Sequence, residues 1–346
     1  MKESDIIQLV RENIKALVPY SSARDEFQGE ASIFLDANEN PFQSEFNRYP
    51  DPHQRQLKNV IGKIKNINTA NIFIGNGSDE AIDLLLRIFC VPGKDRVIIP
   101  QPTYGMYQVS AGVNDVICDT VSLTKTFDLV SSAVLKSVRP ETKIIFVCSP
   151  NNPSGNLFDP LEIEKILEQF NGIVVIDEAY IDFCDAPSWI NRLKEFPNLV
   201  VLQTLSKAWG LASLRLGMAF ANASIIALLD KVKAPYNISG LIQKTVIHQI
   251  EGQQDKKNKM VGVIRKEKLS LANALASLKV VTNVFPSDAN FLLVQVTDAR
   301  KVYDHLAKKG IIVRDRSNVR LCENCLRVSV GTEAENKRLI ESMLQL

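Results

Sequence analysis

The sequence contains no long apolar run. A helix that spans a membrane needs ~20 consecutive apolar residues, and no stretch of this chain approaches that length, so we expect no membrane span. The first ten residues mix Lys2, Glu3 and Asp5 with apolar residues, and therefore lack the uninterrupted apolar stretch of a secretory signal. We accordingly expect a cytoplasmic location.

An excess of charge of either sign is also missing. The 41 basic and 39 acidic residues leave a formal net charge of +2, which gives no general attraction to nucleic acid or to membranes. Any anion must therefore be bound locally. What is present is a globular composition, with 45% hydrophobic and 23% charged residues, in a chain of 346 residues that is long enough to bury a substantial core.

Histidine is scarce, and the six cysteines are spread along the chain without the pattern of a disulfide framework. Cys322 and Cys325 form a C-x-x-C pair, but a zinc site needs two further ligands at suitable spacing. The three histidines, His53, His248 and His305, offer none nearby. We expect buried thiols and no metal site.

Short apolar runs alternate with helical patterns from residue 71 to about residue 222, which is typical of an α/β fold with a mainly parallel sheet. Each run is apolar on both faces, as in a strand that helices cover on both sides. Between two runs, Asp159 and Pro160 predict the start of a crossover helix. The predicted strands are 97–99, 144–147, 173–176, 199–202 and 216–220.

The pattern changes near residue 244, where a long helical stretch around 260–278 begins a smaller α+β domain. Thr332, with Glu335 three residues later, predicts a capping box at the start of the last helix. We divide the chain into an N-terminal segment (1–40) associated with the small domain, a large domain (41–243) and a small domain (244–346). In the small domain, the predicted strands are 280–284, 291–296, 311–313 and 326–330, and the predicted helices are 302–309 and 333–346.

Three predicted strands run into polar motifs at their carboxyl ends, where open α/β sheets bind ligands. Asn152 follows strand 144–147, Asp177 follows strand 173–176, and Lys207 follows strand 199–202. If these strands are neighbours, an amide, a carboxylate and an amine converge on one pocket.

These groups suit the chemistry of pyridoxal phosphate. A lysine followed by Arg215 fits a Schiff-base nucleophile next to an anion site, and an aspartate at the end of an apolar strand fits the protonated ring nitrogen. The glycine-rich stretch 75–78 precedes an apolar periodic segment, so that backbone N–H groups at a helix start could meet a phosphate. Each motif alone also fits an ordinary turn, helix cap or solvated lysine, but their joint occurrence in this order favours a cofactor site.

The set of motifs resembles the fold-type I aminotransferases of class I/II over nearly the whole chain, and most closely those members that act on histidinol phosphate. The matching segments are 19–20, 35–41, 48–51, 75–80, 102–107, 149–155, 177–180, 204–207, 211–217 and 326–332.

The resemblance implies a role for each matching residue at the cofactor. Lys207 would hold pyridoxal 5'-phosphate and move the proton, Asp177 would pair with the ring nitrogen, and Asn152 and Tyr180 would bind the ring hydroxyl oxygen. Tyr104 would stack on the ring. The cofactor phosphate would meet Gly77, Ser78, Asp79, Thr204, Ser206 and Arg215, together with Tyr49 from the other subunit of a homodimer.

At the substrate end, the resemblance implies that Arg327 holds the acidic group, with Tyr20, Asn38 and Arg314 nearby. Arg314 could equally be a surface arginine at a strand end. The implied reaction is reversible amino transfer between L-histidinol phosphate and 2-oxoglutarate, giving imidazole-acetol phosphate and L-glutamate, as a step of histidine biosynthesis. An aromatic or broad-specificity aminotransferase and a phosphothreonine-type decarboxylase remain as alternatives.

Two functions of other classes fit the sequence less well. A ligand sensor fused to a DNA-binding domain would need an appended helix-turn-helix, but the roughly seventy residues before Gly75 already contain family segments and carry no basic patch. A nicotinamide-dependent dehydrogenase would need a third glycine at position 80, where this chain has Glu80.

Overall fold

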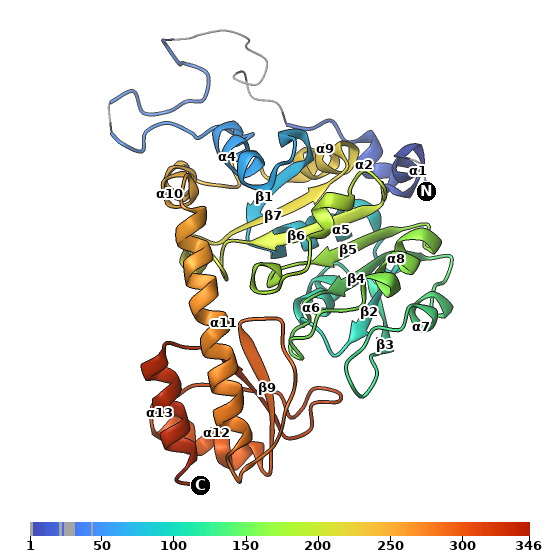
Figure 1. Cartoon of the computed structure of the whole chain (residues 1–346). Helices are drawn as coiled ribbons and strands as arrows, with labels where there is room; N and C mark the ends of the chain where they lie inside the picture. Colours follow the sequence, from blue (N-terminus) through green and yellow to red (C-terminus); the bar gives the residue numbers. More distant parts are fainter. Residues whose placement is uncertain (1–2, 21–22, 24–31, 43) are drawn as a thin grey trace.

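The computed structural model describes residues 3–20, 23, 32–42 and 44–346. Two β-sheets lie at opposite ends of the molecule, and the long helix α11 runs between them (Figure 1). None of the helices over the described residues has the length and apolarity of a membrane span.

The larger sheet has seven strands in the order β1-β7-β6-β5-β4-β2-β3. The five strands from β6 to β3 pair in parallel, while β7 is antiparallel to both of its neighbours, β6 and β1. All five strands predicted in this region are confirmed. The strands are β1 (Ile72–Asn76), β2 (Arg96–Gln101), β3 (Ile117–Ser122), β4 (Thr142–Cys148), β5 (Ile173–Asp177), β6 (Leu199–Thr204) and β7 (Leu216–Ala221).

Helices cover both faces of this sheet because its strands are apolar on both sides. Alternate residues of β5 show this, since Val174 and Ile176 enter the core shared with α4, α8 and α10, whereas Ile173 and Val175 enter the core shared with α5, α6 and α9. The helices are α4 (Arg55–Lys65), α5 (Ser78–Phe89), α6 (Met106–Val113), α7 (Ser131–Lys136), α8 (Pro160–Gln169), α9 (Ala223–Val232) and α10 (Gly240–Ile250), with short 3-10 turns η1 (Thr69–Asn71), η2 (Ile181–Phe183), η3 (Trp189–Arg192) and η4 (Ala212–Leu214).

The smaller sheet has four antiparallel strands in the order β10-β11-β9-β8. Its apolar face, with Leu292 and Leu326, packs against α11, α12 and α13. The capping box of Thr332 and Glu335 is present at the start of α13, as predicted. The elements are α11 (Gln254–Ala276), β8 (Val281–Val284), β9 (Phe291–Val296), α12 (Ala299–Lys308), β10 (Arg314–Asp315), β11 (Cys325–Ser329) and α13 (Glu333–Met343).

The edge strand β10 corrects one prediction. We expected a strand at 311–313, but the ladder with β11 begins at Arg314, and Arg316 extends it by donating its N–H to the Cys325 carbonyl. The side chain of Ile312 is 75% exposed. An apolar run next to a short edge strand therefore does not mark the paired residues, because the register of β11 determines them.

The N-terminal segment does not join the small domain in its described part. Ile6 of helix α1 (Glu3–Leu9), Ile14 of helix α2 (Glu12–Ala16) and Val10 between the two helices enter the core that α5 and α9 share with the large sheet. Arg11 adds a bond from its backbone N–H to the Ile88 carbonyl, with a distance of 3.0 Å. Val246, beyond the predicted boundary at residue 243, also packs in the large domain. The exact boundary stays a prediction.

Candidate active site

The carboxyl ends of β4, β5 and β6 lie side by side, because these three strands pair in parallel in that order. The polar residues that follow them line a single pocket with a volume of about 90 Å³. Of the twelve residues predicted to contact the cofactor, eleven line this pocket. They are Gly77, Ser78, Asp79, Tyr104, Asn152, Asp177, Tyr180, Thr204, Ser206, Lys207 and Arg215.

Lys207 lies just after β6, with its Nζ 5.8 Å from the centre of the Tyr180 ring. Burial lowers the pKa of Lys207 below its usual value, and the positive charges of Arg327 and Arg215 lower it further. A lysine in this setting loses its proton more readily than a solvated one, which is what a nucleophile or a general base requires.

Asp177 ends β5 and is almost completely buried. Its Oδ2 accepts a hydrogen bond from the Tyr107 hydroxyl at 2.7 Å, and its Oδ1 accepts one from the Ala179 N–H at 3.1 Å. Burial raises the pKa of Asp177 to about 6, and the bonds from Tyr107 and Ala179 oppose that rise. A buried carboxylate with two donors suits a cationic partner in the pocket.

Tyr107 is a residue that the sequence interpretation missed. It is fully buried on α6, and its ring stacks on Phe146 of β4 with centroids 4.8 Å apart. Seventy positions separate it from Asp177 along the chain. The sequence contains no signal for this pairing, because a tyrosine on the apolar face of a helix is normally interpreted as a residue of the hydrophobic core.

The loop between β1 and α5 leads into the start of a twelve-residue helix. Gly77 has φ of +73°, a conformation that favours glycine, and its N–H donates to the Arg215 carbonyl at 2.7 Å. Gly217 of β7 lies close to the backbone of Gly77 and Ser78, so that a Cβ atom added to Gly217 would be 2.1 Å from the Ser78 nitrogen. The Arg215 Nη2 is 3.8 Å from Asp79 Oδ2. This cradle of backbone N–H groups, helix start and guanidinium fits a phosphate group.

Arg327 brings the small sheet to the pocket. It lies on β11, its Nη1 donates to Asn152 Oδ1 at 2.5 Å, and its guanidinium is 5.3 Å from the centre of the Phe291 ring. Arg314 lies opposite Arg327 in the β10–β11 ladder, and both side chains line a hollow of about 480 Å³. Two like charges at facing positions favour an anion between them, since they repel each other otherwise.

Tyr49, Asn38 and Tyr20 do not reach the pocket within this chain. Tyr49 is half exposed and stacks on Tyr236, with ring centroids 4.5 Å apart. It shares a separate hollow of about 650 Å³ with Asn38. Tyr20 is 71% exposed. Their predicted roles therefore stay predictions, and the role of Tyr49 is the one that was predicted to need a second subunit.

Comparison with known proteins identifies the class of enzyme to which this site belongs. Residues 32–343 match the family model described as aminotransferase class I and II. The chain is also 53% identical, over 337 residues, to the histidinol-phosphate aminotransferase of Cytophaga hutchinsonii, and the alignment covers 96% of this chain and 97% of that protein. The chain thus belongs to the histidinol-phosphate aminotransferase family of the class I and II aminotransferases.

Solved structures with lower identity share the fold. The histidinol-phosphate aminotransferase of Clostridium acetobutylicum aligns with a TM-score of 0.80 at 22% identity, covering 87% of this chain and 90% of that chain. The enzyme from Sinorhizobium meliloti, in complex with pyridoxal-5'-phosphate, aligns with a TM-score of 0.79 at 23% identity, covering 86% and 82%. These alignments confirm the predicted fold-type I architecture.

Proposed function

We propose that this enzyme catalyses reversible amino transfer between L-histidinol phosphate and 2-oxoglutarate, giving imidazole-acetol phosphate and L-glutamate, in histidine biosynthesis. The cofactor is pyridoxal 5'-phosphate. Family membership supports the reaction, and the observation that carries the assignment is the pocket in which Lys207, Asp177 and the phosphate cradle meet.

Lys207 holds the cofactor covalently and serves as the proton carrier of the reaction. When bound, pyridoxal phosphate supplies a carbonyl that takes up the amino group and a ring that draws electrons from the substrate. With its amine free, Lys207 would take the proton from the α-carbon of the substrate and deliver it to the cofactor carbon that receives the amino group. The lowered pKa of Lys207 supports this role, because a general base must be unprotonated at working pH.

Asp177, Asn152 and Tyr180 orient the cofactor ring. The Asp177 carboxylate would pair with the protonated ring nitrogen, and Tyr180 would donate to the ring oxygen. The amide oxygen of Asn152 accepts from Arg327, which leaves its amide nitrogen as a donor for that same ring oxygen. Tyr104 packs on the ring face, held by a bond of 3.1 Å from its hydroxyl to Asp79 Oδ1.

The start of α5 would hold the cofactor phosphate. Backbone N–H groups of the helix start and the Arg215 guanidinium would provide donors. The hydroxyls of Thr204 and Ser206, whose oxygens are 3.0 Å apart, would provide others. The cofactor phosphate contacts are Gly77, Ser78, Asp79, Thr204, Ser206 and Arg215.

The active unit is a homodimer in which Tyr49 completes the phosphate site of the partner subunit. Its half-exposed ring, away from the pocket of its own chain, supports this arrangement. Exposed apolar side chains on the same N-terminal part, such as Leu35 and Phe42, fit burial against a second copy.

A cytoplasmic location fits the six free thiols, since reducing compartments keep cysteines unpaired.

Arg327 binds the acidic end of both amino donors. Its planar guanidinium matches two oxygens of a carboxylate or of a phosphate. Arg314, across the ladder, adds charge for the phosphate dianion of histidinol phosphate. Tyr20 and Asn38 complete the substrate site in the dimer.

Two measurements test this function. Turnover of histidinol phosphate should exceed that of phenylalanine and phosphothreonine in a steady-state assay with 2-oxoglutarate. A preference for phenylalanine would indicate an aromatic aminotransferase instead. Release of carbon dioxide from phosphothreonine would indicate a decarboxylase. Borohydride reduction followed by peptide mapping should leave the pyridoxyl label on Lys207, and a label on another lysine would overturn the cofactor assignment.

A further inference from the structure

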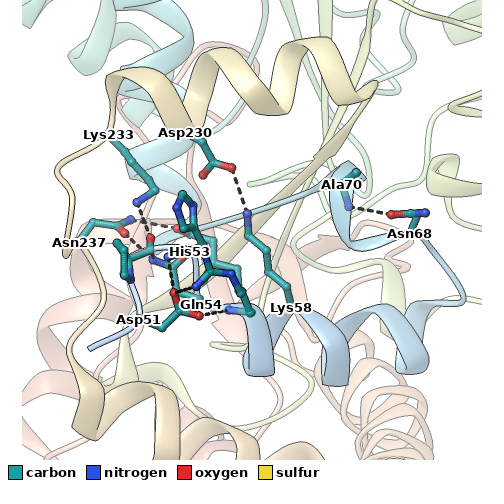
Figure 2. A network of polar contacts seen from close by, with 12 residues as sticks. Asp51, His53, Gln54, Lys58, Asn68, Ala70, Asp230, Lys233 and Asn237 are labelled. Carbon is teal, nitrogen blue, oxygen red and sulfur yellow. Dashed lines mark hydrogen bonds and ion pairs between the residues drawn. The ribbon is translucent and has the colours of Figure 1, made fainter. Parts of the chain in front are cut away.

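Asn237, in the segment between α9 and α10, joins three parts of the large domain through one side-chain amide. Its Nδ2 donates to the Ile74 carbonyl at 3.0 Å and to Glu80 Oε1 at 3.1 Å, and its Oδ1 accepts from Gln54 Nε2 at 3.2 Å. These partners belong to β1, to α5 and to the segment before α4. Figure 2 shows Asn237 next to Gln54 in a network that also contains Asp51 and Lys233.

The bonds to Ile74 and Glu80 stabilise the phosphate loop, by which we mean residues 76–78 at the junction of β1 and α5. Glu80 Oε2 accepts from the Asn76 backbone N–H at 2.5 Å, and Asn76 Nδ2 donates to the Asn237 carbonyl at 2.6 Å. Gly77 and Ser78 follow directly. Asn237 therefore closes a ring of hydrogen bonds around the residues that set the path of the backbone into the phosphate cradle.

The bond from Gln54 stabilises the Tyr49 segment, by which we mean residues 49–54 before α4. Gln54 is buried in the left-handed conformation, with φ of 48°, and also donates to the Pro52 carbonyl at 2.7 Å. Lys233 Nζ donates to the same carbonyl at 2.8 Å (Figure 2). Tyr49 itself stacks on Tyr236, the residue that precedes Asn237. The segment is thus attached to the 233–237 stretch at three points.

We propose that Asn237 is a positioning residue for two cofactor sites at once: for its own subunit's site through the phosphate loop, and for the partner subunit's site through the Tyr49 segment. This inference rests on the proposed function, because it requires pyridoxal phosphate in the cradle and Tyr49 acting across the dimer. In Asn237→Ala the path through the phosphate loop loses two hydrogen bonds, one of them to the Glu80 carboxylate, and the path through the Tyr49 segment loses one bond between neutral groups. The affinity for the cofactor should fall by roughly 3- to 10-fold through the Tyr49 path, which is the range of one lost hydrogen bond between neutral groups, and by at least as much through the phosphate loop.

Heterodimers with two affinity tags separate the two paths. One chain, the holding chain, keeps Lys207, and the other, the donor chain, carries Lys207→Ala, so that the label fixed by borohydride reports one site. That site combines the phosphate loop of the holding chain with Tyr49 of the donor chain. The readout is the concentration of pyridoxal phosphate that gives half-maximal labelling of Lys207.

Asn237→Ala should raise this concentration whether it is placed in the holding chain or in the donor chain. Gln54→Met removes the bond from Gln54 to Asn237, which is one of the three attachments of the Tyr49 segment, and leaves the bonds of Asn237 to Ile74 and Glu80, so it should raise this concentration only from the donor chain. Asn198→Ala is the matched control: Asn198 is buried and donates to three backbone carbonyls, those of Leu167, Phe170 and Gly172, away from the pocket. It should lower thermal stability without changing the labelling curve from either chain.

The outcomes distinguish this inference from the function on which it rests. Labelling unchanged by Asn237→Ala in either chain overturns the inference, and a change from the holding chain alone overturns the shared role. Tyr49→Phe in the donor chain checks the arrangement itself. If that variant has no effect, Tyr49 does not act across the dimer, and if the unmodified holding chain takes up no label on Lys207, the cofactor proposal fails.

Discussion

Removal of the Tyr107 hydroxyl should raise the pKa of Asp177. The carboxylate of Asp177 has donors on both oxygens, and the bond from Tyr107 is the shorter, at 2.7 Å against 3.1 Å from the Ala179 N–H. Tyr107→Phe deletes that donor but retains the ring stacked on Phe146. The variant therefore removes one hydrogen bond from the Asp177 carboxylate with little change in packing.

The size of the effect follows from the strength of the lost bond. A hydrogen bond to a charged group contributes about 1.5–3 kcal/mol, which corresponds to roughly one to two pKa units of the acceptor. The pKa of Asp177 is already raised to about 6 by burial, with the Tyr107 bond holding it down. In Tyr107→Phe it should therefore rise to roughly 7–8.

The pH profile of cofactor affinity measures this change. Asp177 must be ionised to pair with the protonated ring nitrogen, so affinity is retained above the pKa of Asp177 and lost as the pH falls through it. In the apoenzyme, fluorescence titration with pyridoxal phosphate should show this loss near pH 6 for the unmodified protein. The loss should begin about one to two pH units higher in Tyr107→Phe.

Two controls make the result interpretable. Asp177→Asn should abolish this limb of the profile, and Tyr303→Phe, on α12 of the small domain, should leave it unchanged. The titrations of the cofactor itself are the same in every variant and cancel in the comparison. A profile of Tyr107→Phe that coincides with that of the unmodified enzyme would show that the hydroxyl does not set the pKa of Asp177.

Three further predictions concern the proposed roles. Asp177→Asn should lower kcat by orders of magnitude in steady-state assays, and near-normal kcat would reject its pairing with the ring. Inactive Lys207→Ala chains mixed with inactive Tyr49→Phe chains should regain activity, because their heterodimers contain one intact site. Heterodimers without activity would exclude that Tyr49 acts on the site of the other subunit. Arg327→Ala should lower kcat/KM for both amino donors, with a loss of ~2 to 5 kcal/mol of binding energy in the transition state. Arg314→Ala should slow single-turnover conversion of histidinol phosphate more than that of glutamate. Equal losses for the two donors would refute phosphate recognition by Arg314.

The sequence predicted the elements that carry the pocket because their patterns are local. Strand ends with Asn152, Asp177 and Lys207 could be recognised from an apolar run followed by a polar motif, and parallel pairing then brought them together. Strand β3 was missed because its residues are half exposed rather than apolar on both faces. At this edge of the sheet the pattern differs from that of the central strands.

Contacts between distant segments were beyond the reach of the sequence. The bonds from Tyr107 to Asp177 and from Gln54 to Asn237 join residues 70 and 183 positions apart. The docking of Ile6 and Val10 on the large domain is of the same kind, since the apolar face of a helix does not name the surface that covers it. Such pairings follow from tertiary packing and leave no local pattern.

The two ends of the site belong to different sheets. The loops of the seven-stranded sheet carry the groups proposed for the cofactor, whereas Arg327 and Arg314 lie on strands of the four-stranded sheet. The bond from Arg327 to Asn152 links the two ends, whereas Arg314 lies on the edge strand of the smaller sheet. The tight approach of Gly217 to Ser78 resists any added side chain near the phosphate. Arg314, the exposed residue of the edge strand β10, is therefore the place to begin in engineering a new amino donor preference.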